Sequence, residues 1–349
     1  MMADKVINVG LVAFGLSGRY FHAPFLSTNP CFKLKTVVER SRNEAQEFDE
    51  TIENARSLEE LLADDSIDLV FICTPNDTHF QYAMDCLENG KHVVIEKPFA
   101  ATEAEARQLI ALAEEKGLVL TAYQNRRWDS DFLTIQKLIQ EDKLGDIIEF
   151  ECRYDRYRTV VPTESWKEKK VPVGGNLYNL GPHLLDQALV LFGEPETVSA
   201  EIREVRPNSE IDDYFDIRLG YSDKVVIIKS SLMVYDNFLR YSIHGTKGSF
   251  IKGGLDPQEE TLRKNILPTE TPWGVEPEDR WGKLSSDEYT GTIESEAGNY
   301  ALFYQNVYDA IVHGTELAVK PSEILRTTRI IDLAIKSSET KQTLPYSSK

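Results

Sequence analysis

The sequence predicts an α/β protein in which a mostly parallel sheet is followed by a region of antiparallel strands. In the first third, apolar runs rich in β-branched residues alternate with helical segments, a pattern typical of strands joined by crossover helices. After about residue 124 the runs alternate polar and apolar residues, as half-buried antiparallel strands do. The length of 349 residues suits about two domains. We expect them at residues 1–123 and 124–349, and leave open whether the C-terminal helices pack back on the first domain.

The elements of the first region follow from short apolar runs and helix caps. Thr102 and Glu105 form a capping box at the start of one helix, and Gly117 ends it. The expected helices are 57–63, 79–89 and 102–117. The expected strands are 6–13, 34–38, 67–73, 92–95 and 118–123.

The second region has longer strands and a long irregular segment. A polar, turn-rich stretch from residue 255 to 299 has weak periodicity, and we expect it to be an irregular excursion. The expected helices are 131–140, 179–192, 300–313 and 322–338. The expected strands are 147–154, 197–205, 214–221, 224–234 and 238–251.

Charge and cysteine content exclude several classes of function. The formal net charge is −18 and the isoelectric point about 4.9, so we expect neither a nucleic-acid nor a membrane partner. The four cysteines form no CxxC pair and no zinc pattern, which predicts a reducing compartment, the cytoplasm, and no metal site.

The turn after the first strand has the features of a nucleotide-binding turn. The run Ala13-Phe14-Gly15-Leu16-Ser17-Gly18 matches GxGxxG except that alanine replaces the first glycine. Gly15 would let a pyrophosphate approach the backbone, and amides at the start of the next helix would bind it. The acidic Glu39 ends the next strand, as dinucleotide-binding proteins require. An ordinary tight turn is the alternative, which this context disfavours.

The residues after the second strand bear on which dinucleotide binds. Glu39 could hold the ribose diol of NAD, whereas Arg40, Ser41 and Arg42 could hold the 2′-phosphate of NADP. A solvated loop is the competing interpretation of the arginines, and we favour NADP only slightly over NAD. With the other strand exits included, the expected cofactor-binding residues are Ala13, Gly15, Leu16, Ser17, Glu39, Arg40, Ser41, Arg42, Thr74, Pro75, Asn76, His79, Glu96, Lys97 and Asn125.

Lys97 and His183 are the candidates for proton chemistry. Lys97 follows an apolar strand, and Pro98 constrains it to an extended backbone, so its ammonium could polarise a reacting hydroxyl. His183 follows a Gly-rich run, and Asn179 lies four residues earlier on the same helix face. A surface lysine and a buried, satisfied histidine are the structural alternatives. We expect Lys97, His183 and Asn179 to be catalytic.

A second set of residues is a candidate for the substrate. Arg127 follows the fifth strand, and the run Tyr154-Asp155-Arg156-Tyr157 combines aromatic and polar groups, which suits a sugar-like ligand. An exposed strand face explains that run equally well. The expected substrate residues are Arg127, Tyr154, Asp155, Arg156 and Tyr157.

These motifs together resemble the Gfo/Idh/MocA oxidoreductase family over nearly the full length. The resemblance rests on the Gly turn, Thr74-Pro75-Asn76 with His79, Glu96-Lys97-Pro98 and the Gly-rich run ending in His183. The run Phe21-His22-Ala23-Pro24-Phe25 looks like the scyllo-inositol dehydrogenase-like branch, which is often NADP-linked, as do the runs 125–132 and 254–260.

The resemblance implies an N-terminal Rossmann domain and a C-terminal α/β domain whose large open sheet, mostly antiparallel, commonly forms a dimer interface. It therefore implies a homodimer or a dimer-based tetramer. It also implies Lys97 and His183 as the catalytic pair. The family motif usually has Asp four residues before that histidine, whereas this chain has Asn179, which cannot accept a proton as a carboxylate does.

We therefore expect an NAD(P)-dependent oxidoreductase that transfers a hydride between nicotinamide and an alcohol or ketone of a sugar or inositol-like cyclic polyol. One alternative is a dinucleotide-binding sensor or regulator without turnover. The other is an epimerase or eliminase that keeps its cofactor tightly bound and uses it transiently.

Overall fold

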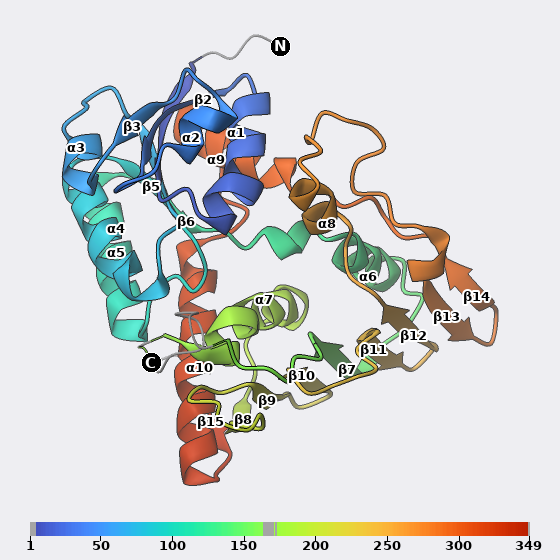
Figure 1. Ribbon diagram of the computed structural model, residues 1–349. Helices are drawn as coiled ribbons and strands as arrows, with labels where there is room; N and C mark the ends of the chain where they lie inside the picture. Colours follow the sequence, from blue (N-terminus) through green and yellow to red (C-terminus); the bar gives the residue numbers. More distant parts are fainter. Residues whose placement is uncertain (1–4, 163–170, 172, 348–349) are drawn as a thin grey trace. The chain divides into compact units, whose positions relative to one another are not determined.

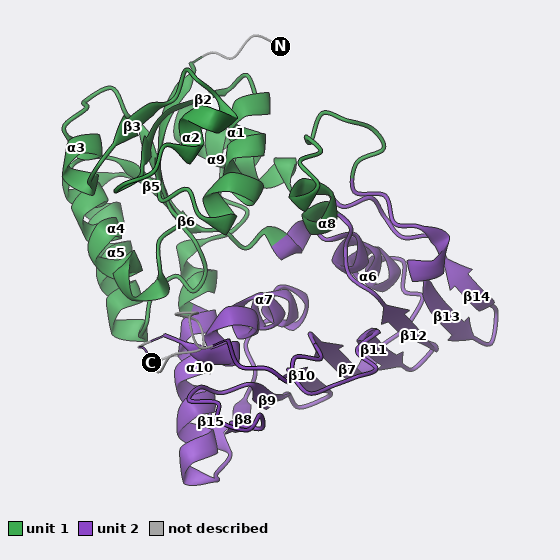
Figure 2. Ribbon diagram, viewed as in Figure 1, with its two compact units in different colours: residues 1–125, 258–273, 299–325 green, residues 126–257, 274–298, 326–349 purple. Residues whose placement is uncertain are grey.

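The computed structural model describes residues 5–162, 171 and 173–347, and the chain forms two compact units (Figure 1, Figure 2). Unit 1 comprises residues 1–125, 258–273 and 299–325. Unit 2 comprises residues 126–257, 274–298 and 326–349. Each unit is thus assembled from three separate stretches of chain.

Unit 1 contains a six-stranded parallel sheet in the order β3-β2-β1-β4-β5-β6, the order of a dinucleotide-binding fold. The strands β4 and β5 are continuous apolar runs because helices cover both faces of such a sheet. The strands are β1 (Ile7–Val12), β2 (Phe32–Val38), β3 (Glu53–Ala55), β4 (Leu69–Ile72), β5 (His92–Ile95) and β6 (Leu120–Ala122).

Helices pack on the two faces of this sheet, with α4 and α5 together on one face and α1 and α9 on the other (Figure 1). The capping box is confirmed: the Thr102 hydroxyl accepts the Glu105 amide at 3.2 Å, and Gly117 ends α5 at φ +64°. The helical elements are η1 (Ser17–His22, a π-helix), α1 (Ala23–Thr28), α2 (Glu44–Phe48), α3 (Leu58–Leu62), η2 (Asn76–Thr78), α4 (His79–Glu88), α5 (Glu103–Lys116), α8 (Gln258–Arg263) and α9 (Ala301–His313).

Unit 2 contains a nine-stranded sheet in the order β14-β13-β12-β11-β7-β10-β9-β8-β15. Only the β7–β10 pair is parallel among the described strands. Helices α6, α7 and α10 bury one face of the sheet in a single apolar core. The expected α/β architecture, with a parallel sheet followed by a large, mostly antiparallel one, is confirmed.

The bounds of the unit 2 elements are as follows. The strands are β7 (Ile147–Arg153), β8 (Thr197–Arg203), β9 (Tyr214–Gly220), β10 (Val225–Ser231), β11 (Leu239–Gly245), β12 (Gly248–Gly253), β13 (Gly282–Ser286), β14 (Thr290–Ile293) and β15 (Leu344–Pro345). The helical elements are η3 (Asn125–Trp128, which begins on the last residue of unit 1), α6 (Ser130–Gln140), α7 (Gly175–Phe192), η5 (Glu278–Arg280) and α10 (Pro321–Thr340, which begins in unit 1).

Two expectations for the strand-rich region are wrong. The run 238–251 is not one strand but the hairpin of β11 and β12. Gly245 permits its turn, because an added Cβ would lie 2.2 Å from the carbonyl oxygen of Leu144. The excursion 255–299 is not irregular throughout, since it contains α8, η5, β13 and β14. Its strands are too short to give a clear period-2 pattern.

A buried ion pair anchors this excursion to the sheet. The ammonium of Lys252 in β12 lies 3.0 Å from the Glu276 carboxylate, and both side chains are fully buried. The same ammonium donates to the carbonyl oxygens of Gly253 at 2.8 Å and Arg280 at 2.7 Å. Ser295 donates to Glu276 at 2.5 Å. A segment with little apolar patterning is therefore positioned by hydrogen-bonded charges.

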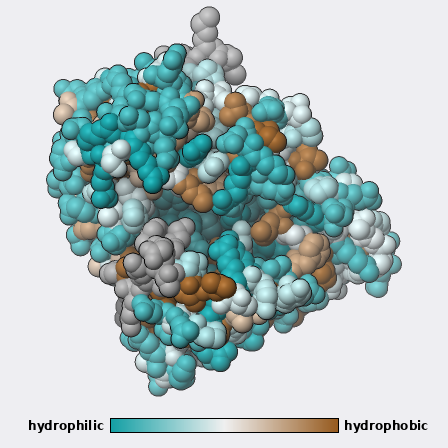
Figure 3. Space-filling view, viewed as in Figure 1, coloured by the Kyte–Doolittle hydropathy of each residue, from teal (hydrophilic) through white to brown (hydrophobic). Residues whose placement is uncertain are grey.

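The surface is strongly polar, in keeping with the net charge. Hydrophilic residues cover most of the face that Figure 3 shows, with scattered apolar patches. None of the described helices has the length and apolar composition needed to cross a bilayer. Over the same described ranges, His, Cys, Asp and Glu side chains form no group suited to a metal ion.

Candidate active site

The register of the parallel sheet in unit 1 brings the ends of its strands to one level. Val12 of β1 pairs with Val38 of β2 and with Ile72 of β4. Ile72 in turn pairs with Ile95 of β5, which pairs with Ala122 of β6. The residues that follow these strands therefore emerge at one edge of the sheet, where open α/β folds bind their ligands.

The turn after β1 leaves its backbone open to a ligand. Ala13 has φ +80°, a left-handed conformation that glycine adopts without strain, which explains why a glycine is usual there. An added Cβ on Gly18 would lie 2.4 Å from the carbonyl oxygen of Ala13, so only glycine fits at that position. Gly15 has no neighbouring atom within 4 Å of an added Cβ. The turn continues into η1 and α1, whose first amides face the same edge of the sheet.

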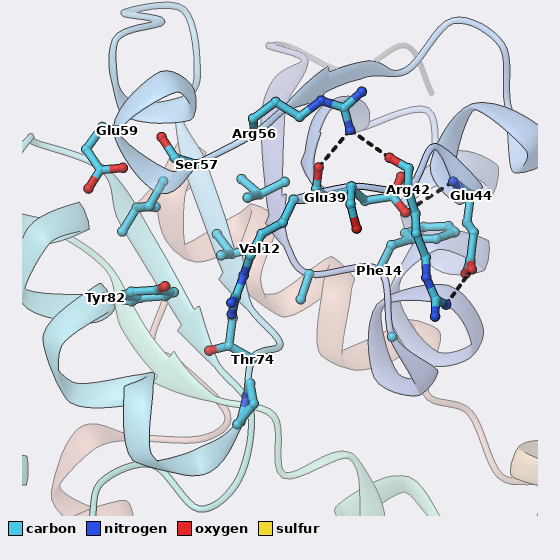
Figure 4. Close-up of a pocket in the computed structure, with 17 residues that line it drawn as sticks. Val12, Phe14, Glu39, Arg42, Glu44, Arg56, Ser57, Glu59, Thr74 and Tyr82 are labelled. Carbon is cyan, nitrogen blue, oxygen red and sulfur yellow. Dashed lines mark hydrogen bonds and ion pairs between the residues drawn. The ribbon is translucent and has the colours of Figure 1, made fainter. Parts of the chain in front are cut away.

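A cavity of about 520 Å³ lies in unit 1 beside this turn (Figure 4). This volume is in the range of small-molecule and cofactor sites. The cavity is lined by Val12, Ala13, Phe14, Gly15, Val38, Glu39, Arg40, Ser41, Arg42, Glu44, Arg56, Ser57, Leu58, Glu59, Thr74, Pro75 and Tyr82. The predicted residues 13, 15, 39–42, 74 and 75 thus share one cavity, and its open backbone turn and cationic rim fit the phosphates of a dinucleotide.

Glu39 lies at this cavity but its carboxylate caps a helix. The two oxygens accept the backbone amides of Glu44 at 3.1 Å and Ala45 at 3.0 Å, at the start of α2, and the residue is 7% exposed. A carboxylate at a helix N-terminus is stabilised by the amides and the helix dipole. The acceptor atoms expected for a ribose diol are therefore engaged inside the protein.

Arg56 is a cavity residue that the sequence analysis did not identify. Its guanidinium donates to the carbonyl oxygens of Glu39 and Arg42, each at 2.8 Å, and to the side chain of Asn43 at 2.7 Å (Figure 4). It follows the three-residue strand β3, which was not predicted, so the sequence offered no reason to place it here. Arg56 fixes the loop 40–42 from below while leaving the side chains of that loop exposed.

The loop after β5 is organised by Glu96. Its carboxylate accepts the His22 ring at 3.1 Å, the hydroxyl of Ser17 and the backbone amide of Lys97 at 3.1 Å. Burial raises the pKa of Glu96, but the hydrogen bond and charge of His22, the charge of Lys97 and the Ser17 hydroxyl lower it to about 2. Glu96 is thus a carboxylate that joins the turn after β1 to the loop that carries Lys97.

His79 joins two other strand exits. Its ring contacts the carbonyl oxygens of Pro98 at 2.8 Å and Thr74 at 3.0 Å. The side chain is buried, and burial lowers the pKa of His79 while the two carbonyl groups act in the opposite direction. Asn76 begins the 3₁₀ turn η2 next to Pro75. His79 therefore braces the loops after β4 and β5 from inside the protein.

The helix α7 carries His183 and Asn179 in unit 2. The helix begins at Gly175, four residues before the expected start, and places His183 in its middle. It begins early because the Asp212 carboxylate accepts the amide of Leu177 at 2.6 Å, which caps the first turn. His183 is 5% exposed, and Asn179 lies one turn before it on the same face.

Arg127 is held by a buried, two-point ion pair. Its Nε and Nη2 donate to the two oxygens of Asp186 at 2.7 and 2.6 Å, and both side chains are less than a tenth exposed. Asp186 lies on α7 three residues after His183. The neighbouring Asn125, the last residue of unit 1, is also buried. The pair ties η3 to α7 and leaves little of the Arg127 charge exposed.

Tyr154 lies among three guanidinium groups. Those of Arg126, Arg156 and Arg240 lie 5.2, 4.9 and 5.0 Å from its ring centre, close enough for cation–π attraction. Asp155 accepts the amide of Ser231 at 2.8 Å. Tyr154, Asp155 and Arg156 line a cavity of about 220 Å³ in unit 2, together with Arg153, residues 237–240, Gly254 and Leu255.

Tyr157, the fourth residue of that run, lies outside the lining of the cavity. It is 47% exposed and packs edge-on against Tyr235. Arg240 does line the cavity and was not identified from the sequence. Its position in a strand of alternating residues suggested an exposed side chain, yet it is fully buried beside Asp131 at 3.5 Å.

Family models match nearly all of this chain. Residues 7–124 match the oxidoreductase family, NAD-binding Rossmann fold, and residues 136–346 match the oxidoreductase family, C-terminal alpha/beta domain, both of the Gfo/Idh/MocA group.

Similar proteins cover almost the whole chain. The scyllo-inositol 2-dehydrogenase (NADP(+)) IolW of Bacillus subtilis is 40% identical over 97% of this chain and 95% of its own length. The uncharacterized oxidoreductase YdgJ of Escherichia coli is 38% identical over 98% of this chain and 99% of its own. The solved structure of an oxidoreductase from Bacillus cereus has a TM-score of 0.89 and 34% identity, and covers 99% of each chain. The chain therefore belongs to the Gfo/Idh/MocA oxidoreductase family.

Proposed function

We propose that the protein is an NADP-dependent dehydrogenase or reductase that transfers a hydride between the nicotinamide and a CH–OH carbon of a sugar or cyclic polyol. The observation that carries this proposal is the Glu96–Lys97 loop at the exit of β5, held at the edge of a dinucleotide-binding sheet. The scyllo-inositol dehydrogenase relative supports a polyol substrate. A levoglucosan dehydrogenase that is 26% identical over 70% of this chain supports a sugar-like one.

The preference for NADP rests on how the loop after β2 uses its charges. The carboxylate that would bind a ribose diol, that of Glu39, caps α2 instead. Arg40, Ser41 and Arg42 are exposed at the cavity. Arg40 forms no ion pair within the part of the chain that the structure describes, and Arg42 pairs only with Glu44, at 2.7 Å. These two guanidinium groups are suited to a 2′-phosphate.

The rest of the cofactor would lie along the ends of the strands. The backbone at Ala13, Gly15, Leu16 and Ser17 would bind the pyrophosphate. The remaining contacts would come from the exits of β4, β5 and β6, at residues 74–76, 79, 96–97 and 125. When bound, the nicotinamide supplies the position that accepts or gives the hydride.

We assign three residues to the proton chemistry. Lys97 donates a hydrogen bond to the reacting oxygen and stabilises its negative charge. His183 exchanges the proton of that hydroxyl, since an imidazole titrates near neutral pH. Asn179 orients the hydroxyl through its amide and takes no proton. His183 is thus the sole proton acceptor of the three when the substrate is an alcohol.

The substrate would be held by the polar groups of unit 2. Tyr154, Asp155 and Arg156 line one cavity and offer an aromatic face, an acceptor and a donor, a combination that suits several hydroxyl groups. Arg127, fixed by Asp186, would add a donor in a set orientation. Tyr157 is assigned to the rim of the substrate site because of its exposure.

The catalytic assignment is tested by following reduced nicotinamide absorbance with a panel of inositols and sugars. Lys97→Ala and His183→Asn should each lower kcat by about 10²- to 10⁴-fold, the usual range for a group that transfers or stabilises a proton. The exposed Lys116→Ala is the matched control and should retain full turnover. Either active-site variant turning over at the wild-type rate would rule out these roles. Product formed without net reduction of the cofactor would instead indicate epimerisation or elimination.

The cofactor preference is tested with Arg40→Ala, Arg42→Ala and their combination. Each single change should lower kcat/KM for NADP by about tenfold, since one charge-assisted contact to phosphate is lost, and the pair should lower it by more. The values for NAD should stay within about threefold. Arg107→Ala, in the exposed pair with Glu103, is the control. A wild-type preference for NAD that Arg40 and Arg42 do not influence would overturn the assignment.

We also propose a homodimer, or a tetramer built from it, in the cytoplasm. On the face of the unit 2 sheet away from its helices, half-buried charges form cross-strand pairs such as Lys229–Asp216 at 3.1 Å. Apolar side chains such as Ile227 and Val225 lie among them, and such a mixed face suits a second copy of the chain. All four cysteines are free, which supports a reducing compartment. Light scattering of the purified protein tests the oligomer.

A further inference from the structure

His22 is a buried histidine to which the proposed chemistry assigns no task. It ends η1 and belongs to the run Phe21-His22-Ala23-Pro24-Phe25 that the sequence analysis singled out. Its side chain is 1% exposed. Nε2 lies 3.1 Å from a carboxylate oxygen of Glu96, and Nδ1 lies 3.0 Å from the hydroxyl of Tyr304 in α9. Both ring nitrogens therefore have a polar partner inside unit 1.

The hydrogen-bond partners fix the protons on this ring. The Tyr304 hydroxyl lies 2.6 Å from the carbonyl oxygen of Phe21, which can only accept, so the single phenolic proton points there. Nδ1 of His22 must then donate to the Tyr304 oxygen. Glu96 is a carboxylate, which also only accepts, so Nε2 must donate to it. Each nitrogen therefore carries a proton, and the ring is an imidazolium.

The surroundings of the ring suit a cation. The ring centres of Tyr123 and Phe71 lie 4.4 and 4.9 Å from that of His22, within the distance at which aromatic faces attract positive charge. The titratable groups that face this cluster are Glu96 and Lys97 after β5, Tyr304 on α9, Tyr123 after β6 and Cys73 after β4.

We propose that His22 is a buried imidazolium and a positioning residue for the loop that carries Lys97. Its catalytic consequence rests on the function proposed above, while its protonation state does not. One oxygen of Glu96 accepts both His22 and Ser17, and the other accepts the amide of Lys97. The imidazolium keeps this carboxylate charged, and the carboxylate can then hold the Ser17 turn and the Lys97 loop together.

Loss of the imidazolium would change what Glu96 can accept. A buried carboxylate without a positive partner takes up a proton or turns toward water. In either case it loses an acceptor site for Ser17 or for the amide of Lys97. The loop would then drift relative to the turn, and displacements on the order of 1 Å at a reacting centre are costly to catalysis.

The protonation state is tested directly by NMR on protein with ¹⁵N-labelled imidazole rings. His22→Gln assigns the signal by its disappearance. If that variant does not fold, single variants of the other five histidines assign it by elimination. We expect His22 to show two protonated nitrogens at about pH 8, where an ordinary histidine is neutral. A neutral tautomer at that pH would overturn the proposal, whether or not the enzyme is active.

A second spectrum asks whether Glu96 holds the charge. In Glu96→Gln the amide cannot balance a cation, so the His22 signal should become that of a neutral ring. His79, which contacts only carbonyl oxygens, is the internal comparison and should keep its wild-type signal. A His22 that remains doubly protonated in Glu96→Gln would contradict the role given to the carboxylate.

The positioning role is tested by the split between kcat and KM. His22→Gln should lower kcat by about 10- to 100-fold, because Lys97 is misplaced, while KM for the dinucleotide changes by less than about threefold. The control is His92→Gln at the opposite end of β5, whose ring accepts the amide of Val119 at 2.9 Å. It should leave kcat within about twofold of wild type. A His22→Gln enzyme that is less stable but has wild-type kcat would show that the residue is merely structural. An inactive wild type would instead refute the proposed function and leave the spectrum to decide the imidazolium.

Discussion

Glu96 in unit 1 and Asp212 in unit 2 perform the same structural task under opposite electrostatic conditions. Each carboxyl group accepts a backbone amide at the start of a candidate catalytic segment, Lys97 in one case and Leu177 of α7 in the other. The pKa of Glu96 is lowered to about 2, since His22 outweighs the effect of burial. Burial raises the pKa of Asp212 to about 6, and the adjacent Asp213 adds to this effect.

The difference shows that backbone amides alone do not keep a buried carboxylate charged. Asp212 accepts amide hydrogens from α7, which lower its pKa, yet the net shift is upward. Glu96 has an imidazole at 3.1 Å, and its net shift is downward. Asp213 resembles Glu96, because Arg206 lies 2.7 Å from it. A positive partner therefore decides whether such a group is a carboxylate at neutral pH.

Removal of the positive partner in unit 2 should have the largest effect. Arg206→Met leaves Asp213 uncompensated in a site where both side chains are fully buried. We expect the free energy of unfolding to fall by about 3 to 5 kcal/mol. Urea denaturation measures it. The control, Arg218→Met, removes an exposed partner of Asp216 and should cost less than about 1 kcal/mol. Equal losses would show that burial of the pair is not what matters.

Displacement of the Asp212 side chain should have the next largest effect. Gly175 has φ +89°, and an added Cβ would lie 1.8 Å from an oxygen of Asp212. Gly175→Ala should therefore destabilise the protein by about 2 to 4 kcal/mol, through backbone strain and loss of the cap on α7. Gly193→Ala has comparable φ, +71°, and no atom within 4 Å, so it reports the strain alone, about 1 kcal/mol. If both variants unfold at the same urea concentration, the Asp212 cap contributes nothing.

The smallest effect, and the sharpest for the comparison, is the pH dependence of two isosteric variants. Glu96 has a folded pKa below its ordinary value of 4.5, so its stabilisation is complete above that value and is lost as pH falls toward about 2. The gap in stability between wild type and Glu96→Gln should thus narrow by roughly 1 kcal/mol when pH falls to about 4.

Asp212 should behave in the opposite way. Its folded pKa of about 6 lies above its ordinary value of 3.8, so its contribution is greatest below that value and is lost as pH rises through about 6. Relative to Asp212→Asn, wild type should therefore gain about 2 kcal/mol between about pH 7 and pH 4. Urea denaturation at several pH values measures both gaps. Slopes of the same sign would show that the two sites do not differ as described.

Much of unit 1 was predictable because its signals are local. Apolar runs predicted β1, β4 and β5, and the parallel arrangement explains why their exits meet at one edge. The three-residue strand β3 was missed, since Glu53 and Asn54 interrupt any apolar pattern at this edge of the sheet. Arg56 was missed with it.

The polar partners in unit 2 were not predictable because they are distant in sequence. Lys252 pairs with Glu276 across a turn-rich excursion, and Leu177 meets Asp212 across a segment that carries no motif. Tyr304 illustrates a third case. Its helical spacing with other aromatic residues predicted a buried side chain, which is correct, but not the hydroxyl that meets His22.

The discontinuity of unit 1 has a consequence for synthesis on the ribosome. His22 leaves the exit tunnel early, but its partner Tyr304 follows 282 residues later. Tyr304 also stacks on Phe25 at 4.9 Å and lies within residues 299–325, the last stretch of this unit. The nascent N-terminal region must therefore wait for nearly the entire polypeptide before its charged interior can close.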